Sequence, residues 1–385
     1  MLQVLFRIPI TTNGLPIYGF GMTLFLAFIA CTWLAGRRAE REGIPKETIQ
    51  DLAVWLFIGG LLGARITYLL FDMDPRPGVW DFFKLLPRIW EGGIVFYGSV
   101  LGGVAAYALA YLLIYRHRGL STRRLLDAIA PSICLGLCLG RLGCLLNGCC
   151  YGGVCTAEHA GVTPVTFPLS APARSVLVDV GAQTIAGFSV VAEPRGAHDG
   201  AVVQEVDPTS QAFAAGLRPE MVITGLNSTE IHSRYDLDTA VGSPPLRAGE
   251  SDLNLTYLPP PDQPQKEETM TIAPRTLGLY PTQVYETISM VLLMLVLLAY
   301  YPFRTNPGQV CALLMIGYGI HRSLNEILRD DPRPEGLESY GSVFLVAAGV
   351  LMWVWLWRTS PAAPPPKLQA ANPESAPRPE AFPTS

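Results

Sequence analysis

The chain has 385 residues, with 28 Lys and Arg against 32 Asp and Glu, which gives a formal net charge of −4. Charged residues make up 16% of the chain and hydrophobic residues 50%, whereas about 25% of an ordinary soluble domain is charged. This composition excludes an ordinary soluble protein, and the near-neutral charge offers no basic face for nucleic acid. We therefore interpret the chain as a membrane protein with no nucleic-acid partner.

Seven windows are long and apolar enough to cross a bilayer, since a spanning helix needs about 20 mostly apolar residues. They are, approximately, 17–36, 51–71, 94–115, 126–147, 281–301, 308–327 and 338–357. Each is predicted to be helical because lipid offers no partner for unpaired backbone groups. The first window has no basic segment before it and no small-residue cleavage site after it. It is therefore predicted to be a retained span rather than a removed signal peptide.

Lys and Arg gather in the connections 37–50 and 116–125, while the alternate connections 72–93 and 328–337 carry fewer. Because cytoplasmic loops are enriched in these residues, the N-terminus is predicted outside and the C-terminus inside. The predicted fold class is an all-α polytopic membrane protein with seven transmembrane helices. Spans one to four fall in 1–152 and spans five to seven in 279–358. The Pro/Ala-rich residues 359–385 are predicted to be a disordered cytoplasmic tail.

Residues 153–278 form a long insert, which the same charge count places on the outer side. The stretches 175–183 (SVLVDVGAQ) and 187–193 (GFSVVAE) have strand-like patterns. Within the insert, about 175–258 resembles a PDZ domain in several marks. These are a candidate carboxylate-binding loop at Gly187-Phe188-Ser189-Val190, a strand at Ala201–Val206, a turn and helix around Ala215-Gly216-Leu217, a strand at Met221–Leu226 and a helix from about Tyr235. The resemblance implies an α+β domain that binds an extended peptide along a sheet edge, with an inert β-rich cap as the alternative. The usual Gly-Asp before the second of these strands is Glu220-Met221 here.

Three arginines, Arg65, Arg141 and Arg322, fall inside the predicted spans, 14, 15 and 14 residues from the predicted cytoplasmic ends. At 1.5 Å per residue they reach about 21 Å into a core of roughly 30 Å. Guanidinium groups fit phosphate and stay charged when desolvated. Glu326 follows Arg322 by four residues, so the two share a helix face and can pair. We interpret the three arginines as a site for an anionic headgroup; the alternative is that each snorkels or pairs with a carboxylate.

Four segments around these arginines carry distinctive motifs. They are WEGGIVFYGSVLGG (90–103), GRLGCLLNGCCYGG (140–153), LYPTQVYE (279–286) and GYGIHRSLNEILRD (317–330). With the Arg65 segment, Asp127…Pro131 and Tyr18, they resemble the prolipoprotein diacylglyceryl transferase family. The resemblance runs from Gly140-Arg141 to Gly152 in the family signature and covers nearly all of the membrane part, in order.

The resemblance implies a bacterial inner-membrane enzyme whose insert is periplasmic. Such an enzyme passes a diacylglyceryl group from phosphatidylglycerol to the lipobox cysteine of a prolipoprotein signal peptide, and releases glycerol phosphate. On this reading Arg141 and Arg322 are catalytic and hold the phosphate, where cations stabilise the developing negative charge. The resemblance implies that Arg65 supports phosphate binding and that Glu326 orients Arg322. It also implies Asn147 and Tyr18 as hydrogen-bonding groups for the headgroup, and Gly152 as a further substrate-binding residue. No cofactor and no metal are expected.

Two departures from the family pattern bear on activity. Tyr97 stands where the family has a histidine, and Cys144 and Cys149 replace an Asn and a Glu. Tyr97 is the third catalytic candidate, although a phenol with a pKa near 10 is a poor base, and it also fits an interfacial aromatic. The base therefore lies elsewhere, or the cationic field activates the thiol, or activity is lost. In the last case the chain is a lipid-binding envelope scaffold acting through its PDZ-like domain.

Cysteines crowd the outer end of the fourth span: Cys144, Cys149, Cys150 and Cys155. Their spacing, C-x₄-C-C-x₄-C, is not a usual zinc pattern, and His159 is the nearby histidine. On an oxidising face a disulfide from Cys155 to Cys144 or Cys149 is one alternative. Simple packing and a redox role are the others.

Overall fold

The computed structural model describes residues 3–9, 15–73, 76–88, 93, 95–155, 163–184, 186–191, 200–242, 252–330 and 337–359. Within these residues, six helical segments are long and apolar enough to cross a membrane. They are Gly19–Arg41, Lys46–Phe71, Tyr97–Tyr115, Thr122–Asn147, Thr282–Phe303 and Tyr340–Thr359. Each matches one of the predicted windows, so the chain is a multi-pass membrane protein.

A helix also fills the seventh predicted window. This helix, α10 (Gln309–Leu328), carries polar and charged residues in its second half, among them His321, Arg322 and Glu326. It is not one of the six apolar segments. Six predicted spans are thus confirmed as membrane-length apolar helices, while the crossing of the seventh stays a prediction.

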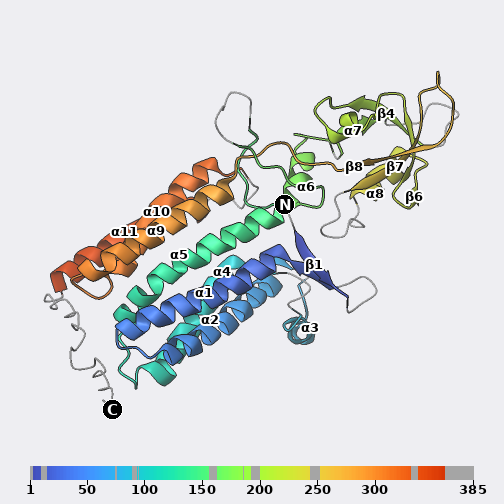
Figure 1. Ribbon diagram of the computed structural model, residues 1–385. Helices are drawn as coiled ribbons and strands as arrows, with labels where there is room; N and C mark the ends of the chain where they lie inside the picture. Colours follow the sequence, from blue (N-terminus) through green and yellow to red (C-terminus); the bar gives the residue numbers. More distant parts are fainter. Residues whose placement is uncertain are drawn as a thin grey trace, which may run out of the picture.

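The helices form two groups on either side of α5 (Thr122–Asn147), as Figure 1 shows. One group holds α1 (Gly19–Arg41), α2 (Lys46–Thr67) and α4 (Phe96–Ala110); the other holds α9 (Thr282–Tyr300), α10 and α11 (Leu337–Thr359). α5 packs against α1 on one side and α9 on the other, and it also contacts α10. The long amphipathic α5 is therefore the element that joins the two groups.

Small residues let α2 and α4 approach closely. Gly59 and Gly63 on α2 face Gly98 and Gly102 on α4, and each pair is spaced by four residues. A Cβ atom at Gly63 would clash with the carbonyl oxygen of Gly98, and one at Gly102 with that of Gly59. This is the small-xxx-small packing by which membrane helices associate.

A buried ionic cluster ties the helices together at the opposite end from the insert. Asp127 near the start of α5 is fully buried and accepts hydrogen bonds from the backbone N–H groups of Gly308 (2.7 Å) and Cys311 (3.0 Å) at the start of α10. Arg304 donates to Asp127 at 3.0 Å and also pairs with Glu42. One carboxylate from α5 thus caps the N-terminus of α10.

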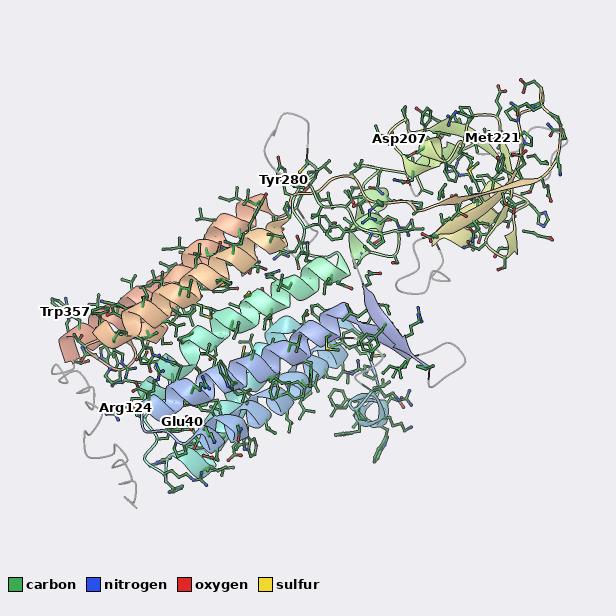
Figure 2. The ribbon with its side chains drawn as sticks, in the orientation of Figure 1. Glu40, Arg124, Asp207, Met221, Tyr280 and Trp357 are labelled. Atoms are coloured by element: carbon green, nitrogen blue, oxygen red, sulfur yellow. The ribbon has the colours of Figure 1, made fainter. Side chains whose placement is uncertain are left out.

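The two ends of the helix bundle differ in character. Figure 2 labels Glu40, Arg124 and Trp357 at one end and Tyr280 at the other. The hairpin of β1 (Val4–Ile8) and β2 (Leu15–Tyr18) and the short helix α3 (Val79–Leu85) lie toward the Tyr280 end (Figure 1). The cation-rich connections 37–50 and 116–125 lie at the other end.

The insert folds around its own sheet and core. The sheet comprises β3 (Phe188–Val190), β4 (Ala201–Val206), β5 (Val222–Leu226), β7 (Leu253–Leu258) and β8 (Glu268–Ile272), hydrogen-bonded in that order, with β6 (Thr229–Glu230) paired to β5. Two helices, α7 (Gln211–Ala214) and α8 (Arg234–Gly242), accompany it. The best-buried core residues are Leu169, Val203, Ala212, Leu217, Ile223, Leu226, Ile231, Leu253, Leu255 and Ile272.

The strand prediction for 175–183 is wrong, because residues Pro172–Asp179 form the helix α6. Pro172 occupies the first turn, where its fixed φ favours a helix start. Ala173 and Leu177, four residues apart, then bury one face against Phe167. The predicted strands at 201–206 and 221–226 are confirmed as β4 and β5, and the helix near residue 235 as α8. The sheet runs on to residue 272, past the predicted boundary at 258.

Part of the strand expected at 187–193 is β3, and residues 192–199 lie outside the described part of the chain. So do residues 360–385 of the predicted tail. Glu220, which precedes β5 in place of the usual glycine, has a φ of 70°. The backbone thus keeps the left-handed conformation that a glycine adopts freely.

Candidate active site

Arg141 and Glu286 form a buried ion pair between α5 and α9. Nε of Arg141 lies 2.9 Å from Oε1 of Glu286, and the Glu286 side chain is 1% exposed. The other carboxylate oxygen accepts a hydrogen bond of 2.7 Å from Nδ2 of Asn325 on α10. One carboxylate therefore joins three helices and fixes the orientation of the Arg141 guanidinium.

Arg322 lies on the same helix as Asn325 and pairs with Glu326, with 3.1 Å between Nη2 and Oε2. This pair confirms the contact expected from their spacing of four residues. His321 lies within electrostatic range of Glu286, Arg141 and Arg322. The structure thus brings the two predicted phosphate-binding arginines into one charged neighbourhood.

Tyr318 on α10 and Arg329, directly after this helix, complete the neighbourhood. Tyr318 lies within electrostatic range of Glu286, of Arg141 and Arg322, and of Arg329. Tyr318 therefore lies near three guanidinium groups and the buried Glu286 carboxylate. The sequence alone gave no role to Glu286, Asn325 or Arg329, although all three lie in the motifs at 279–286 and 317–330. We name Arg141, Glu286, Arg322, Asn325 and Arg329 the arginine site.

Buried polar atoms with unused hydrogen-bonding capacity lie at this site. Nε2 of His321, Oδ1 of Asn325 and Oε1 of Gln283 are buried and have no hydrogen-bond partner among the described residues. Leaving such atoms unsatisfied costs free energy. A cationic group of side chains with spare acceptors beside it is suited to an anionic ligand that also carries hydroxyl groups.

The chain turns sharply where α5 ends, and this turn places cysteines beside the arginine site. Gly148 caps the helix in the left-handed conformation, with a φ of 79°. The N–H groups of Gly148 and Cys149 both donate to the carbonyl oxygen of Cys144, at 2.9 and 3.2 Å. This glycine cap folds the next two residues back over the last turn of α5.

Three thiols meet at this turn. The Sγ atoms of Cys144, Cys149 and Cys150 all lie within 4.8 Å of one another. Hydrogen bonds with the Cys144 and Cys149 thiols lower the pKa of Cys150, and the charges of Arg141 and Arg329 add to this effect. All eight cysteines are free thiols in this structure, so none of the disulfides considered from the sequence is formed.

The other predicted site residues lie as follows. Asn147 donates to Sγ of Cys149 at 3.6 Å, and its carbonyl oxygen accepts from the Gln3 side chain at 3.1 Å. Gly152 donates its N–H to the carbonyl oxygen of Tyr280 at 3.0 Å. A Cβ atom at Gly152 would lie 2.7 Å from the carbonyl oxygen of Leu328. Both residues therefore hold the segment after α5 against its neighbours.

Arg65, Tyr97 and Tyr18 belong to the α1–α2–α4 group. Arg65 is 3% exposed and donates through Nε and Nη2 to the carbonyl oxygen of Leu85, at 3.3 and 3.0 Å. Tyr97 on α4 and Tyr18 at the end of β2 are both 48% exposed. The described contacts of Arg65 thus tie α2 to α3, whereas those of Arg141 tie α5 to α9.

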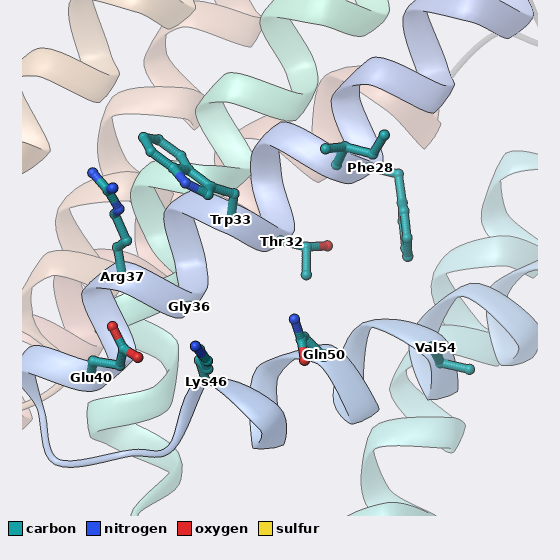
Figure 3. A pocket seen from close by; sticks show the side chains of 10 residues that line it. Phe28, Thr32, Trp33, Gly36, Arg37, Glu40, Lys46, Gln50 and Val54 are labelled. Atoms are coloured by element: carbon teal, nitrogen blue, oxygen red, sulfur yellow. The ribbon is translucent and has the colours of Figure 1, made fainter.

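A cavity of about 580 Å³ opens between α1 and α2, and Figure 3 shows Arg37, Glu40, Lys46 and Gln50 around it. None of the predicted site residues lines this cavity. It lies toward the cation-rich end of the bundle.

The sequence matches the family model for prolipoprotein diacylglyceryl transferase over residues 4–355. The chain belongs to this family of transferases. The phosphatidylglycerol–prolipoprotein diacylglyceryl transferase of Rhodopirellula baltica is 30% identical over 376 residues, which cover 90% of this chain and 73% of that enzyme. The enzyme of the same name from Geobacillus kaustophilus is 34% identical over 156 residues, covering 40% of this chain and 54% of that enzyme. The second alignment thus spans about half of its relative.

Among solved structures, the chain is similar to the HtrA3 PDZ domain bound to a phage-derived ligand. Their sequences are 21% identical, and the match covers 30% of this chain and 87% of the PDZ chain, with a TM-score of 0.17. That score carries no argument about fold, so the PDZ reading of the insert rests on its own strands and helices.

Proposed function

We propose that this diacylglyceryl transferase moves the diacylglyceryl group of phosphatidylglycerol onto the cysteine thiol of a prolipoprotein, with Arg141 and Arg322 holding the phosphate. The observation that carries the proposal is the buried Arg141–Glu286–Asn325 junction beside Arg322. Guanidinium groups held in a site with little water are suited to a phosphate that gains charge in the transition state.

The reaction is a displacement at carbon. The sulfur of the prolipoprotein cysteine forms a bond to the glycerol carbon that carries the phosphate ester. The carbon–oxygen bond breaks, and glycerol phosphate leaves with the electron pair. Arg141 and Arg322 stabilise this leaving group, and Glu286 and Glu326 keep the two guanidinium groups in place.

The spare acceptors at the arginine site suit the rest of the headgroup. Oδ1 of Asn325 and Oε1 of Gln283 can each accept a hydrogen bond, and the headgroup glycerol carries two hydroxyl donors. A headgroup without hydrogen-bond donors would leave these buried oxygen atoms unsatisfied, which costs about 1–3 kcal/mol for each such group. This difference favours phosphatidylglycerol over phospholipids whose headgroups carry no hydrogen-bond donor.

The nucleophile must be a thiolate. We assign the stabilisation of its charge to Arg141 and Arg329 rather than to Tyr97, because Tyr97 lies on α4 in the α1–α2–α4 group, whereas Arg141 and Arg322 lie on α5 and α10. Tyr97 is half-exposed near the start of α4 and has the character of an aromatic at the membrane interface.

The topology that completes this proposal has α10 as the seventh span, the N-terminus outside and the C-terminus inside. The cation-rich connections support it, because they lie at the opposite end of the bundle from Tyr280 and the insert. The insert is then periplasmic on a bacterial inner membrane.

We further propose that the insert binds a peptide as PDZ domains do. A cavity of about 180 Å³ lies between β3 and α8, lined by Phe188, Val190 and Leu237 among others. β3 pairs only with β4 among the described strands, so its other edge is available for strand addition. Binding of a labelled apolar peptide with a free C-terminal carboxylate, and none of its amidated form, would support this groove. Equal binding of the two forms would leave the insert as a cap.

The transfer itself is tested in liposomes with acyl-labelled phosphatidylglycerol and a peptide that carries a lipobox cysteine. Label should move to the peptide with the parent protein and be lost in Arg141→Ala. Arg124→Ala, at the other end of the bundle, is the matched control and should transfer normally. A folded parent that binds the lipid but moves no label would favour the scaffold alternative.

A further inference from the structure

We propose that Cys144, Cys149 and Cys150 bind a Zn²⁺ ion whose fourth position takes the cysteine thiol of the prolipoprotein. This inference rests on the proposed transfer reaction and identifies the group that activates its nucleophile. The three thiols lie beside Arg141, which is within electrostatic range of Cys144 and Cys150. The metal site would then lie next to the phosphate site. The reaction requires this, because the glycerol carbon that is attacked lies between the sulfur and the phosphate.

The distances suit a zinc ion. All three Sγ atoms lie within 4.8 Å of one another, and sulfur atoms bonded to tetrahedral zinc at about 2.3 Å are about 3.8 Å apart. Each pair of thiols thus closes by at most about 1 Å when the ion binds. Small side-chain rotations are enough for this change.

The backbone already holds the ligands in position. The Gly148 cap folds Cys149 and Cys150 back toward Cys144. The side chains of Thr282 and Gln283 on α9 donate to the carbonyl oxygen atoms of Cys150 and Cys149, at 2.8 and 2.7 Å. These bonds fix both peptide units from outside the turn.

Cys150 itself adopts a costly conformation. Its φ is 59°, in the left-handed region that a residue with a Cβ rarely enters. Such strain persists where surrounding contacts impose it, and it clusters at functional sites. Here it directs a third thiol toward Cys144 and Cys149.

The charges around the thiols also suit a bound cation. Arg141 lies within electrostatic range of Cys144 and Cys150, and Arg329 lies within electrostatic range of Cys150. Three thiolates and one Zn²⁺ leave one negative charge, which these two guanidinium groups offset. Three sulfur ligands select a thiophilic ion such as zinc over magnesium or calcium.

The fourth position is open among the described residues. No other His, Cys, Asp or Glu of the described chain joins the three cysteines, and each of the three is only partly buried. Structural zinc sites have four protein ligands, whereas catalytic sites have three and keep one position for substrate. His159 lies outside the described residues, so the test below includes a variant of it.

Coordination to zinc deprotonates the substrate thiol in a chain that has Tyr97 where the family has a histidine. A thiol that binds zinc loses its proton to solvent and becomes a thiolate. Its sulfur then attacks the glycerol carbon, the carbon–oxygen bond breaks, and glycerol phosphate leaves toward Arg141 and Arg322. No oxidant or reductant takes part, and the product thioether leaves the metal as a weaker ligand.

The first experiment measures metal binding by the full-length protein in detergent, after treatment with a chelator and a reductant. Co²⁺ should bind at one equivalent and give the charge-transfer absorbance of cobalt–thiolate bonds. Cys144→Ser, Cys149→Ser and Cys150→Ser should each weaken cobalt binding at least about 100-fold, since even outer-shell changes cost about 10–100-fold. Cys155→Ser and Cys311→Ser are matched controls and should bind as the parent does.

The second experiment adds the lipobox peptide to the cobalt-loaded protein. The charge-transfer absorbance should rise by about one third, because a fourth thiolate joins three. A peptide with serine in place of the lipobox cysteine should leave the spectrum unchanged. An unchanged spectrum with the cysteine peptide would show that its thiol does not take the fourth coordination position. Loss of cobalt binding in His159→Ala would show that a residue of this chain is the fourth ligand.

Turnover separates this inference from the transfer proposal. Transfer should fall at least about tenfold in the chelated parent and return with Zn²⁺. Undiminished transfer by the metal-free protein would overturn the zinc inference but not the transfer proposal. In that case, loss of transfer in His321→Gln would assign activation of the thiol to the His321 imidazole. The spectral change needs no turnover, so it tests whether the metal binds the peptide thiol even in a protein that transfers nothing. Absence of transfer by the parent would contradict the transfer proposal alone.

Discussion

Arg141 on α5 and Glu286 on α9 form an ion pair of 2.9 Å whose carboxylate is almost completely buried. Asn325 holds the second oxygen of that carboxylate from α10. The pair therefore fixes a cation where three helices meet and couples the packing of the bundle to the geometry of the phosphate site. Its two members are 145 positions apart in the chain, so only the fold brings them together.

Glu286→Gln should lower transfer without preventing phospholipid binding. The amide can still contact Asn325 but no longer pairs with Arg141, whose guanidinium then has no fixed position. Misplacement of about 1 Å can cost about 100-fold in rate, and we expect a fall of this order in kcat/KM. The measurement is label transfer in liposomes, with the exposed Glu40→Gln as the control. Unchanged kcat/KM would show that this pair does not position Arg141 for the reaction.

Tyr97→Phe should keep transfer within about threefold of the parent rate, since Tyr97 lies on α4 in the α1–α2–α4 group, whereas Arg141 and Arg322 lie on α5 and α10. Rates measured from pH 6 to pH 9 decide the question. If Tyr97 were the base, the variant would lose both its activity and the rise of the parent rate toward high pH. A loss above about 100-fold would restore Tyr97 to the catalytic role that its sequence position suggested.

The sequence was sufficient for features that depend on local spacing. Six apolar windows are helices, and the four-residue spacing of Arg322 and Glu326 gives the observed pair. Local pattern misled at 175–183, where alternating apolar residues suggested a strand. Pro172 starts a helix there, and its neighbours Ala173 and Leu177 pack on one face. The spacing of apolar residues alone does not distinguish a short strand from one buried helical turn.

Contacts across the fold could not be predicted in this way. Glu286 stood in a recognised motif, but its partner Arg141 depends on how α9 packs on α5. The cysteine spacing argued against zinc because C-x₄-C-C-x₄-C is not a usual zinc pattern, yet the fold brings Cys144, at the end of α5, close to Cys149 and Cys150, beyond it. Gly148 was the available signal, because a glycine directly after a predicted helix indicates a left-handed cap. Such a cap returns the residues after it to the last helical turn.

Gly102→Ala should destabilise the contact between α2 and α4. The added methyl group would meet the carbonyl oxygen of Gly59, and the Cα of Gly63 at 2.8 Å, so the helix backbones must separate. Overpacking of this kind costs about 1–3 kcal/mol, which should lower the Tm of the detergent-solubilised protein. Gly103→Ala is a matched control one residue away, because nothing lies within 4 Å of its added methyl group. Equal Tm values for the two variants would contradict this close packing.

Asp127→Ala should destabilise the protein more than any of these changes. Asp127 is fully buried and satisfies the N–H groups of Gly308 and Cys311 as well as the Arg304 guanidinium. Its removal leaves these donors unmatched away from water, and breaking a buried pair in this way costs about 3–5 kcal/mol. The Tm should fall clearly, while the exposed Asp51→Ala should leave it unchanged.

Asp127→Asn separates charge from hydrogen bonding at this position. Its amide oxygen can still accept from the N–H groups at the start of α10 but no longer neutralises Arg304. Recovery of most of the Tm by this variant would assign the stabilisation to the capping of α10, and no recovery would assign it to the ion pair. Because α10 also carries Arg322, a loosened helix start should lower transfer in Asp127→Ala in parallel with the Tm. Full transfer by a strongly destabilised Asp127→Ala protein would show that the two ends of α10 are independent.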